Sequence, residues 1–71
     1  MEAKNCTISV LGTMVLVEFG KDASIPSAKE LIELAEKNDI DEIVLSKMDD
    51  DYQIGRWEYR KVDNGEWWFI R

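Results

Sequence analysis

Residues 55–71 read GRWEYRKVDNGEWWFIR, and this stretch predicts a β-hairpin. Asn64-Gly65 lies between two runs that are rich in aromatic residues, and both of its residues tolerate the positive φ angles of a tight turn. Successive side chains of a strand point to opposite faces, so the adjacent Trp67 and Trp68 cannot both be buried on one side of a sheet. One indole is therefore expected to face away from the core.

Two turn lengths fit this hairpin. A two-residue Asn64-Gly65 turn pairs Val62 with Trp67, whereas a three-residue turn with Gly65 in a left-handed bulge position pairs Val62 with Glu66. In the first register one face carries Trp57, Tyr59, Trp68 and Ile70. In the second register one face carries Trp57, Tyr59, Trp67 and Phe69, and the opposite face carries Trp68, Ile70, Arg60, Glu58 and Glu66. We favour the second register, because it gathers four aromatic side chains beneath a helix and leaves a mostly charged set outside.

A first hairpin is predicted around Gly12-Thr13, since a two-residue II′ turn requires glycine at its first position. In this register one face of the hairpin is entirely apolar. Its residues are Cys6, Ile8, Val10, Val15, Val17 and Phe19. Such sorting is typical of an antiparallel pair that is buried on one side. A single long strand bent at Gly12 is the alternative.

Residues 27–38 predict an amphipathic helix. Ser27 and Glu30 have the spacing of a capping box, with Ser24 as an alternative cap, and Asn38 is expected to end the helix. The apolar residues at helical spacing form its expected buried stripe. They are Ala28, Leu31, Ile32 and Ala35, with Ile25 or Leu34 extending the stripe.

A third strand is predicted at residues 43–48, and Asp49-Asp50-Asp51 should end it, because aspartate is unfavourable in strands. The expected fold is therefore a small α+β single domain over residues 1–71, in the order β-β-α-β-β-β. Its sheet should be twisted and largely antiparallel, with one helix packed on one face. The pattern leaves the order of the strands across the sheet open.

The composition excludes several classes of function. The chain of 71 residues has one cysteine and no histidine, so it contains neither an internal disulfide nor a serine–histidine or cysteine–histidine nucleophile. Cys6 is expected to be an inert core thiol. We predict no enzymatic activity, no cofactor and no metal site. The chain shows no secretory pattern and no apolar segment long enough to cross a membrane, so a cytoplasmic protein is expected.

The net charge of −6 is concentrated in the middle of the chain. Residues 22–51 contain ten acids and three lysines, a net charge of −7. Direct binding to nucleic acid is therefore disfavoured, because it requires the opposite sign of charge. An acidic surface is instead suited to a protein partner with a basic surface. The two carboxylate clusters, at residues 39–42 and 49–51, lack the spacing of a calcium loop and are interpreted as solvated acidic loops, with weak cation binding as the alternative.

These features favour a small non-enzymatic protein-binding domain. Trp68, Ile70, Arg56 and Arg60 are the predicted anchors, since tryptophan and arginine dominate binding energies. The acidic residues expected to steer it onto a basic surface are Asp39, Asp41, Glu42, Asp49, Asp50 and Asp51. In size and acidity the chain resembles small phage proteins that act against host defence, including anti-CRISPR inhibitors and DNA mimics. That resemblance implies an inhibitor that occludes a basic protein surface.

Three other interpretations are open. The protein is alternatively an accessory or structural homodimer whose aromatic hairpin face is its own interface. A purely structural account has the chain termini cover the outward apolar groups, or Arg56 and Arg60 stack on an exposed indole through cation–π contacts. Single-stranded nucleic-acid binding through the last hairpin is the weakest alternative, since only a few basic residues accompany its aromatics.

Overall fold

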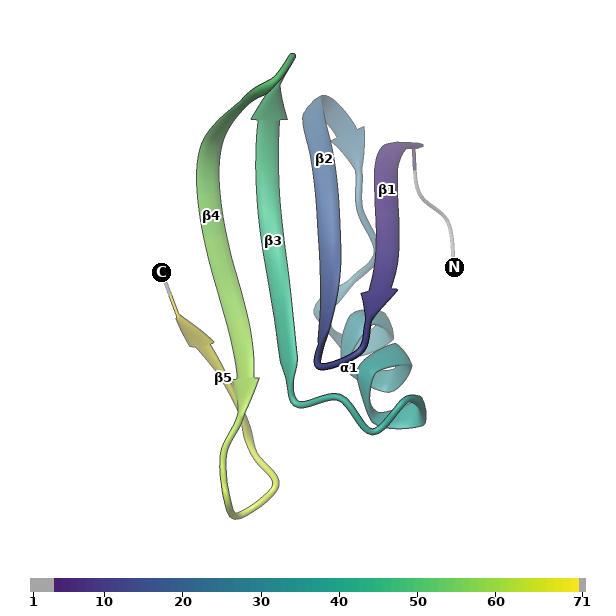
Figure 1. Cartoon of the computed structure of the whole chain (residues 1–71), viewed down its shortest axis with the longest axis vertical. Helices are drawn as coiled ribbons and strands as arrows, with labels where there is room; N and C mark the ends of the chain where they lie inside the picture. Colours follow the sequence, from purple (N-terminus) through teal and green to yellow (C-terminus); the bar gives the residue numbers. More distant parts are fainter. Residues whose placement is uncertain (1–3, 71) are drawn as a thin grey trace.

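The computed structural model describes residues 4–70 and contains a five-stranded sheet with one helix on one face (Figure 1). The elements are β1 (Lys4–Leu11), β2 (Met14–Ser24), α1 (Ala28–Lys37), β3 (Glu42–Asp49), β4 (Tyr52–Lys61) and β5 (Trp67–Ile70). The strands lie in the order β1-β2-β3-β4-β5 across the sheet. β2 and β3 are parallel, because α1 connects them, and the other neighbouring pairs are antiparallel. The predicted α+β class with a mostly antiparallel sheet is confirmed.

The first hairpin has the predicted register. Leu11 pairs with Met14, Val10 with Val15 and Cys6 with Phe19. Gly12 has a φ of 60°, the left-handed value that the first position of a II′ turn requires. The alternative of one long strand bent at Gly12 is therefore wrong.

The helix begins where the sequence places it. Ser27 Oγ accepts a hydrogen bond from the Glu30 backbone N–H at 3.2 Å, and Asn38 caps the other end. Leu31 and Ala35 are buried, Ile32 and Leu34 are half-buried, and Ala28 is exposed. The prediction that Ala28 belongs to the buried stripe is wrong, because this residue is exposed to solvent.

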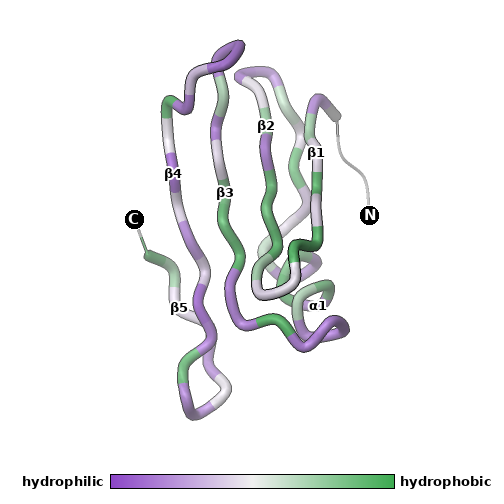
Figure 2. The backbone as a smooth tube through the Cα atoms, in the orientation of Figure 1, coloured by the Kyte–Doolittle hydropathy of each residue, from purple (hydrophilic) through white to green (hydrophobic). Residues whose placement is uncertain are grey.

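The core lies between α1 and the strands β2 and β3. Its fully buried side chains are Leu31, Ile43, Val15 and Val17. Hydrophobic positions concentrate in the parts of β2 and β3 nearest α1, and hydrophilic positions gather at the turns (Figure 2). Asp50, with a φ of 52°, makes the predicted turn after β3. Within residues 4–70, no helix combines the length and apolar character that crossing a membrane requires.

The last hairpin adopts the favoured register with the three-residue turn. Val62 donates a backbone hydrogen bond to Glu66 at 2.8 Å, and Gly65, with a φ of 87°, donates to Val62 at 2.9 Å. Tyr59 pairs with Phe69, and Arg60 pairs with Trp68. Trp68 and Ile70 therefore point to the sheet face opposite to that of Trp67 and Phe69.

One part of the hairpin prediction is wrong. Phe69 was expected beneath the helix, yet 54% of its surface is exposed. Trp57, Tyr59 and Trp67 are half-buried and pack against the core. The reason is positional: α1 lies behind β1 and β2 and packs on β3, and it does not extend to β5 (Figure 1).

Candidate functional site

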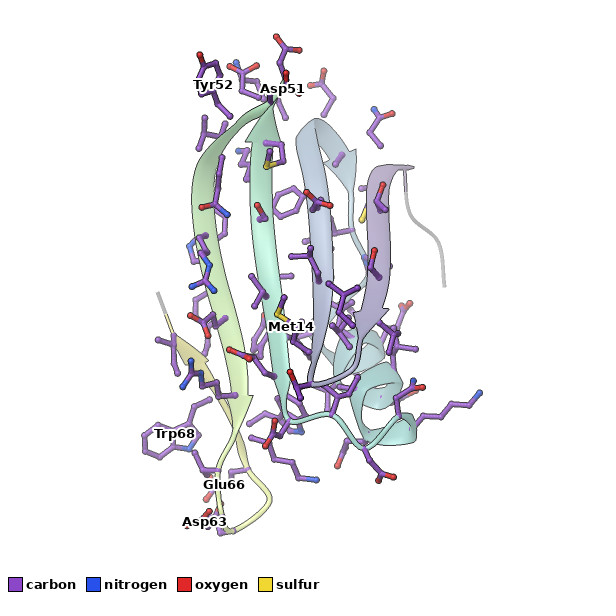
Figure 3. The ribbon with its side chains drawn as sticks, viewed as in Figure 1. Met14, Asp51, Tyr52, Asp63, Glu66 and Trp68 are labelled. Atoms are coloured by element: carbon purple, nitrogen blue, oxygen red, sulfur yellow. The ribbon has the colours of Figure 1, made fainter. Side chains whose placement is uncertain are left out.

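Within residues 4–70, no helix covers the face of the sheet opposite α1, and we call it the open face (Figure 3). Strand alternation and register place on it the following residues: Ser9, Leu11, Leu16, Glu18, Glu42, Val44, Ser46, Arg56, Glu58, Arg60, Trp68 and Ile70. All four predicted anchors, Arg56, Arg60, Trp68 and Ile70, are thus on one surface. Glu42 is the one predicted acidic residue that joins them.

The charged residues of the open face form a continuous ladder of ion pairs. Arg56 Nη1 lies 2.6 Å from Glu58 Oε2, Arg60 Nε lies 3.1 Å from Glu58 Oε1, and Arg60 Nη2 lies 3.3 Å from Glu42 Oε2. Both guanidinium groups therefore bind carboxylates, and the aromatic contacts found within residues 4–70 include none with either arginine. We call these four residues the charge ladder.

Glu58 is the centre of the charge ladder. A hydrogen bond shared with the Glu42 carboxyl holds the pKa of Glu58 below its usual value, and the hydrogen bonds from Arg56 and Arg60 act in the same direction against the effect of burial. The neighbouring carboxylates raise the pKa of Arg60 above its usual value. These shifts favour the charged forms of Glu58 and Arg60, which lie side by side with opposite signs.

The centre of the open face is buried, although the face as a whole is exposed to solvent. Val44 and Ser46 are both buried on it. Val44 lies between Leu16 and Glu58 on the neighbouring strands, and Ser46 Oγ accepts a hydrogen bond from Gln53 Nε2 at 2.7 Å. The long side chains of β2 and β4 therefore cover the middle of this face, and its exposed apolar area lies at its margins.

The exposed apolar area is largest on β5. Three successive residues of this strand are exposed: Trp68 at 58%, Phe69 at 54% and Ile70 at 39%. Trp68 and Ile70 lie on the open face and Phe69 on the other, so β5 is apolar on both sides. We call β5 with the adjoining charge ladder the β4–β5 surface. Large exposed apolar groups beside charged ones are typical of protein-binding surfaces.

The remaining predicted acidic residues do not join this surface. Asp49 ends β3, and Asp50 and Asp51 form the turn to β4, where Figure 3 labels Asp51. Asp39 and Asp41 instead lie in the loop between α1 and β3. These positions are at opposite ends of β3, about 26 Å apart for eight residues at the usual rise per residue. Asp49 also forms an ion pair with Lys21 at 3.1 Å. The acidic groups therefore form two separate clusters at the two ends of the sheet.

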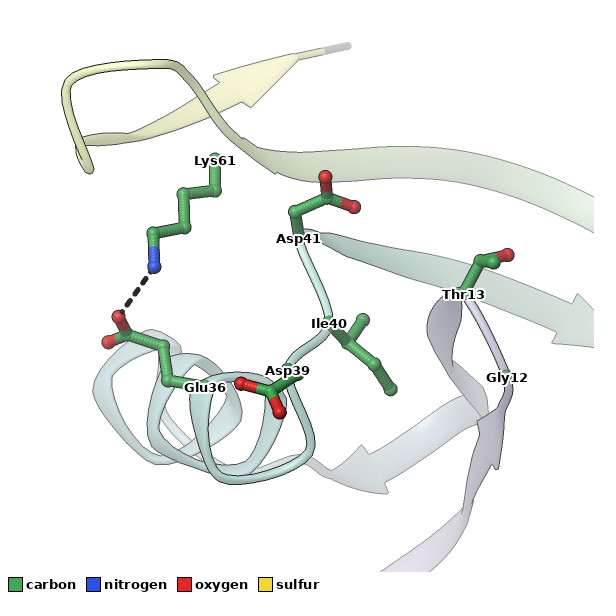
Figure 4. Close-up of a pocket in the computed structure, with 7 residues that line it drawn as sticks. All are labelled: Gly12, Thr13, Glu36, Asp39, Ile40, Asp41 and Lys61. Carbon is green, nitrogen blue, oxygen red and sulfur yellow. Dashed lines mark hydrogen bonds and ion pairs between the residues drawn. The ribbon is translucent and has the colours of Figure 1, made fainter.

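A shallow pocket of about 450 Å³ lies at the end of the sheet next to Asp39 and Asp41 (Figure 4). Two of its lining residues form an ion pair, with Lys61 Nζ 3.1 Å from Glu36 Oε2. The Lys61 backbone N–H donates a hydrogen bond to the Asp41 carbonyl at 2.9 Å. The lysine offsets part of the local negative charge. Within residues 4–70, no group of three or more histidine, cysteine or acidic side chains is arranged to hold a metal ion.

Cys6 is half-buried on the helix side of the first hairpin. Burial raises the pKa of its thiol, so that the reactive thiolate is disfavoured at neutral pH.

No protein-family model, curated protein or solved structure matches this chain.

The charge ladder was not predicted as a unit. Its signal is nevertheless present in the sequence, because Arg56, Glu58 and Arg60 alternate along one strand and so share a face. The contribution of Glu42 had no such signal, since its place beside Arg60 depends on the pairing of β3 with β4.

Proposed function

We propose that the protein is a small non-enzymatic protein-binding domain that docks through its β4–β5 surface. The observation that carries this proposal is the exposure of three consecutive apolar residues of β5 beside the charge ladder. Tryptophan and arginine are the residues most enriched at the energetic centres of protein interfaces. Trp68 is the proposed anchor, and Ile70 and Arg60 are its supporting neighbours.

The charge ladder sets the chemistry of the partner. Both arginines are already paired with carboxylates, so the surface offers alternating charges rather than one sign. A partner that docks here would provide an apolar groove for Trp68. Around that groove it would carry charged groups of both signs. The two acidic clusters flank this surface at the ends of the sheet, and they would steer a partner that carries basic groups beyond its central groove.

An inhibitor that occludes a basic surface, of the anti-CRISPR or DNA-mimic type, is the narrower form of this proposal and stays a prediction. A DNA mimic presents rows of carboxylates in place of phosphates. Here the clusters of Asp39 with Asp41 and of Asp49–Asp51 are separated by the length of β3. The geometry thus supports aromatic anchoring with acidic steering more than mimicry of a duplex.

The test is affinity capture with matched variants, using the immobilised protein and an extract of its source cells. Trp68→Ala should abolish capture of the specific partner. Leu11→Ala is the control, because Leu11 lies on the same open face at the opposite edge of the sheet and is 47% exposed. A partner retained by Leu11→Ala and lost by Trp68→Ala supports the proposal. Equal capture by both variants and the wild type would refute the assigned surface.

A second variant tests the steering role of the acidic end. Replacing Asp49, Asp50 and Asp51 together by asparagine should weaken capture at low salt and have little effect at about 1 M salt, where the Debye length is about 3 Å. Capture that is equally sensitive to salt with and without these carboxylates would remove them from the proposed site.

A further inference from the structure

The two edges of the sheet differ in how they are protected. β1 has an irregular register between Lys4 and Cys6, where Asn5 takes a φ of 53°, and such a bulge disrupts the pairing of an additional strand. β5 pairs regularly with β4 over all of its residues and contains no charge, proline or bulge. Among residues 4–70, no strand pairs with the outer side of β5. Regular apolar edges of this kind accept a further strand.

The backbone groups available at this edge follow from the hairpin. Val62 and Glu66 form a hydrogen-bonded pair, and such pairs alternate along an antiparallel ladder. The backbone groups of Trp68 and Ile70 are therefore directed at β4. Those of Trp67 and Phe69 are directed away from it and remain available to another strand.

We propose that β5 pairs antiparallel with β5 of a second copy of this chain, so that two sheets join into one. A two-fold axis perpendicular to the sheet keeps both open faces on the same side. Paired residues must then lie on the same face, which Trp67 and Phe69 satisfy. In this register the backbone N–H and C=O of Trp67 bond those of Phe69 of the second copy, and the two Trp68 side chains lie side by side on the open face.

A second copy suits this edge better than a charged partner strand. β5 is uncharged, so the pairing places no like charges opposite each other. It also covers Phe69 on the helix side, where α1 leaves it exposed. The homodimer that the sequence leaves open as an alternative is thereby given a specific geometry, through the strand edge rather than the hairpin face. The pairing does not depend on the proposed function.

The expected dimer is weak. The exposed parts of Trp68, Phe69 and Ile70 in two copies amount to roughly 600 Å², taking about 150–250 Å² for a large free side chain. Stable interfaces bury about 1,200–2,000 Å². Each copy also carries a net charge of −6, so salt that screens their repulsion should strengthen the pairing. Docking on a basic partner has the opposite salt dependence, and the two interactions are therefore distinguishable.

Sedimentation velocity between about 10 µM and about 1 mM, at about 0.15 M and about 1 M salt, measures the pairing directly. We expect a dimer that grows with concentration and with salt. Phe69→Lys should raise its dissociation constant at least about tenfold, because the lysine would be buried without a partner. Val10→Lys is the matched control, since Val10 lies at the other end of the same cross-strand row and is 46% exposed. A wild type that stays monomeric throughout, or a Phe69→Lys variant that dimerises as well as Val10→Lys, overturns the proposal.

Hydrogen exchange of the wild type gives a second measurement that needs no substitution. The amides of Trp68 and Ile70 should be protected at every concentration, whereas those of Trp67 and Phe69 should become protected only as the dimer forms. Rapid exchange of Trp67 and Phe69 at the highest concentration would show that the edge is free, and it would leave that edge to a strand of a different protein. Loss of the dimer with retained partner capture would refute this inference alone, and the reverse result would refute the proposed function alone.

Discussion

The two halves of the sheet are similarly rich in apolar residues and differ in what covers them. In the half formed by β1, β2 and β3, the side chains of Val15, Val17 and Ile43 are fully buried against α1. In the half formed by β4 and β5, Trp57, Tyr59 and Trp67 are half-buried, and Trp68, Phe69 and Ile70 are exposed. Burial of an apolar side chain in this sheet therefore depends on how far the single helix extends over the strands, and not on hydrophobicity.

The reach of α1 is set by simple dimensions. A helix of ten residues is about 15 Å long and about 10 Å wide. The outer strands of a five-stranded sheet are about 19 Å apart at the usual spacing of about 4.8 Å. One such helix covers two or three strands, so the last strands remain open.

The covered half should depend strongly on each buried side chain. Leu31→Ala removes a fully buried side chain between α1 and the sheet, and it should lower the free energy of unfolding by about 2–5 kcal/mol. Leu11→Ala is the same substitution at a half-exposed edge position and should cost about 0.5 kcal/mol or less. Urea denaturation followed by circular dichroism measures both. Similar losses for the two variants would contradict the division into a covered and an open half.

Gly55, in β4 next to the covered half of the sheet, has no room for a larger side chain. A Cβ at this position would lie 2.5 Å from the Trp57 ring, which stacks on Phe19 with centroids 6.4 Å apart. Gly55→Ala should therefore displace the indole and cost about 1–3 kcal/mol. Gly20→Ala is the control, since a Cβ there meets no atom within 4 Å. A shift in tryptophan fluorescence in the Gly55 variant alone would confirm the displacement.

The cap of α1 supports the covered half. Ser27→Ala removes the acceptor of the Glu30 N–H and should cost about 1 kcal/mol. Ser24→Ala changes an exposed serine at the end of β2 and should be close to neutral. Thermal unfolding of the two variants compares them, and an equal change in Tm would argue against the cap.

The charge ladder of the open half predicts a dependence on pH. The pKa of Glu58 is lowered in the folded protein, so its contribution to stability is present above its unfolded pKa of about 4.5 and is lost as the pH falls below that value. Glu58→Gln should lose this contribution at neutral pH and show a smaller decrease in stability on acidification. Urea midpoints between neutral pH and about pH 3 measure the difference. Parallel curves for the variant and the wild type would exclude a stabilising role for the ladder.

Trp67 and Trp68 are adjacent in sequence but differ in burial, so their replacement should have different effects on stability. Trp68→Ala should change the free energy of unfolding by about 0.5 kcal/mol or less, because its indole lies in solvent. Trp67→Ala should cost at least about 1 kcal/mol more, because Trp67 packs against the core. Chemical denaturation of both variants at low protein concentration tests this without interference from association. A larger loss for Trp68 would reverse the assigned faces.

Much of the fold could be predicted because its signals are local. Gly12-Thr13, Asn64-Gly65 and Ser27 each specify a turn or cap through their own backbone preferences, and the alternation of side chains then sorts the faces. The opposite orientations of Trp67 and Trp68 follow from the same alternation. The candidate site was predicted in part for this reason: Arg56, Arg60, Trp68 and Ile70 lie on neighbouring strands with a readable register.

The rest depended on contacts between residues distant in sequence. The exposure of Phe69 was missed because no local pattern states how far α1 extends over the sheet.

The sequence by itself determined the elements, their turns and the two-sided apolar character of β5, since each of these follows from backbone preference and a period of two. Only the tertiary structure decided which apolar side chains are buried and how Glu42 joins the arginines. The physical reason is that burial and charge proximity arise from the placement of whole elements against one another, and that placement is fixed by packing across the entire chain.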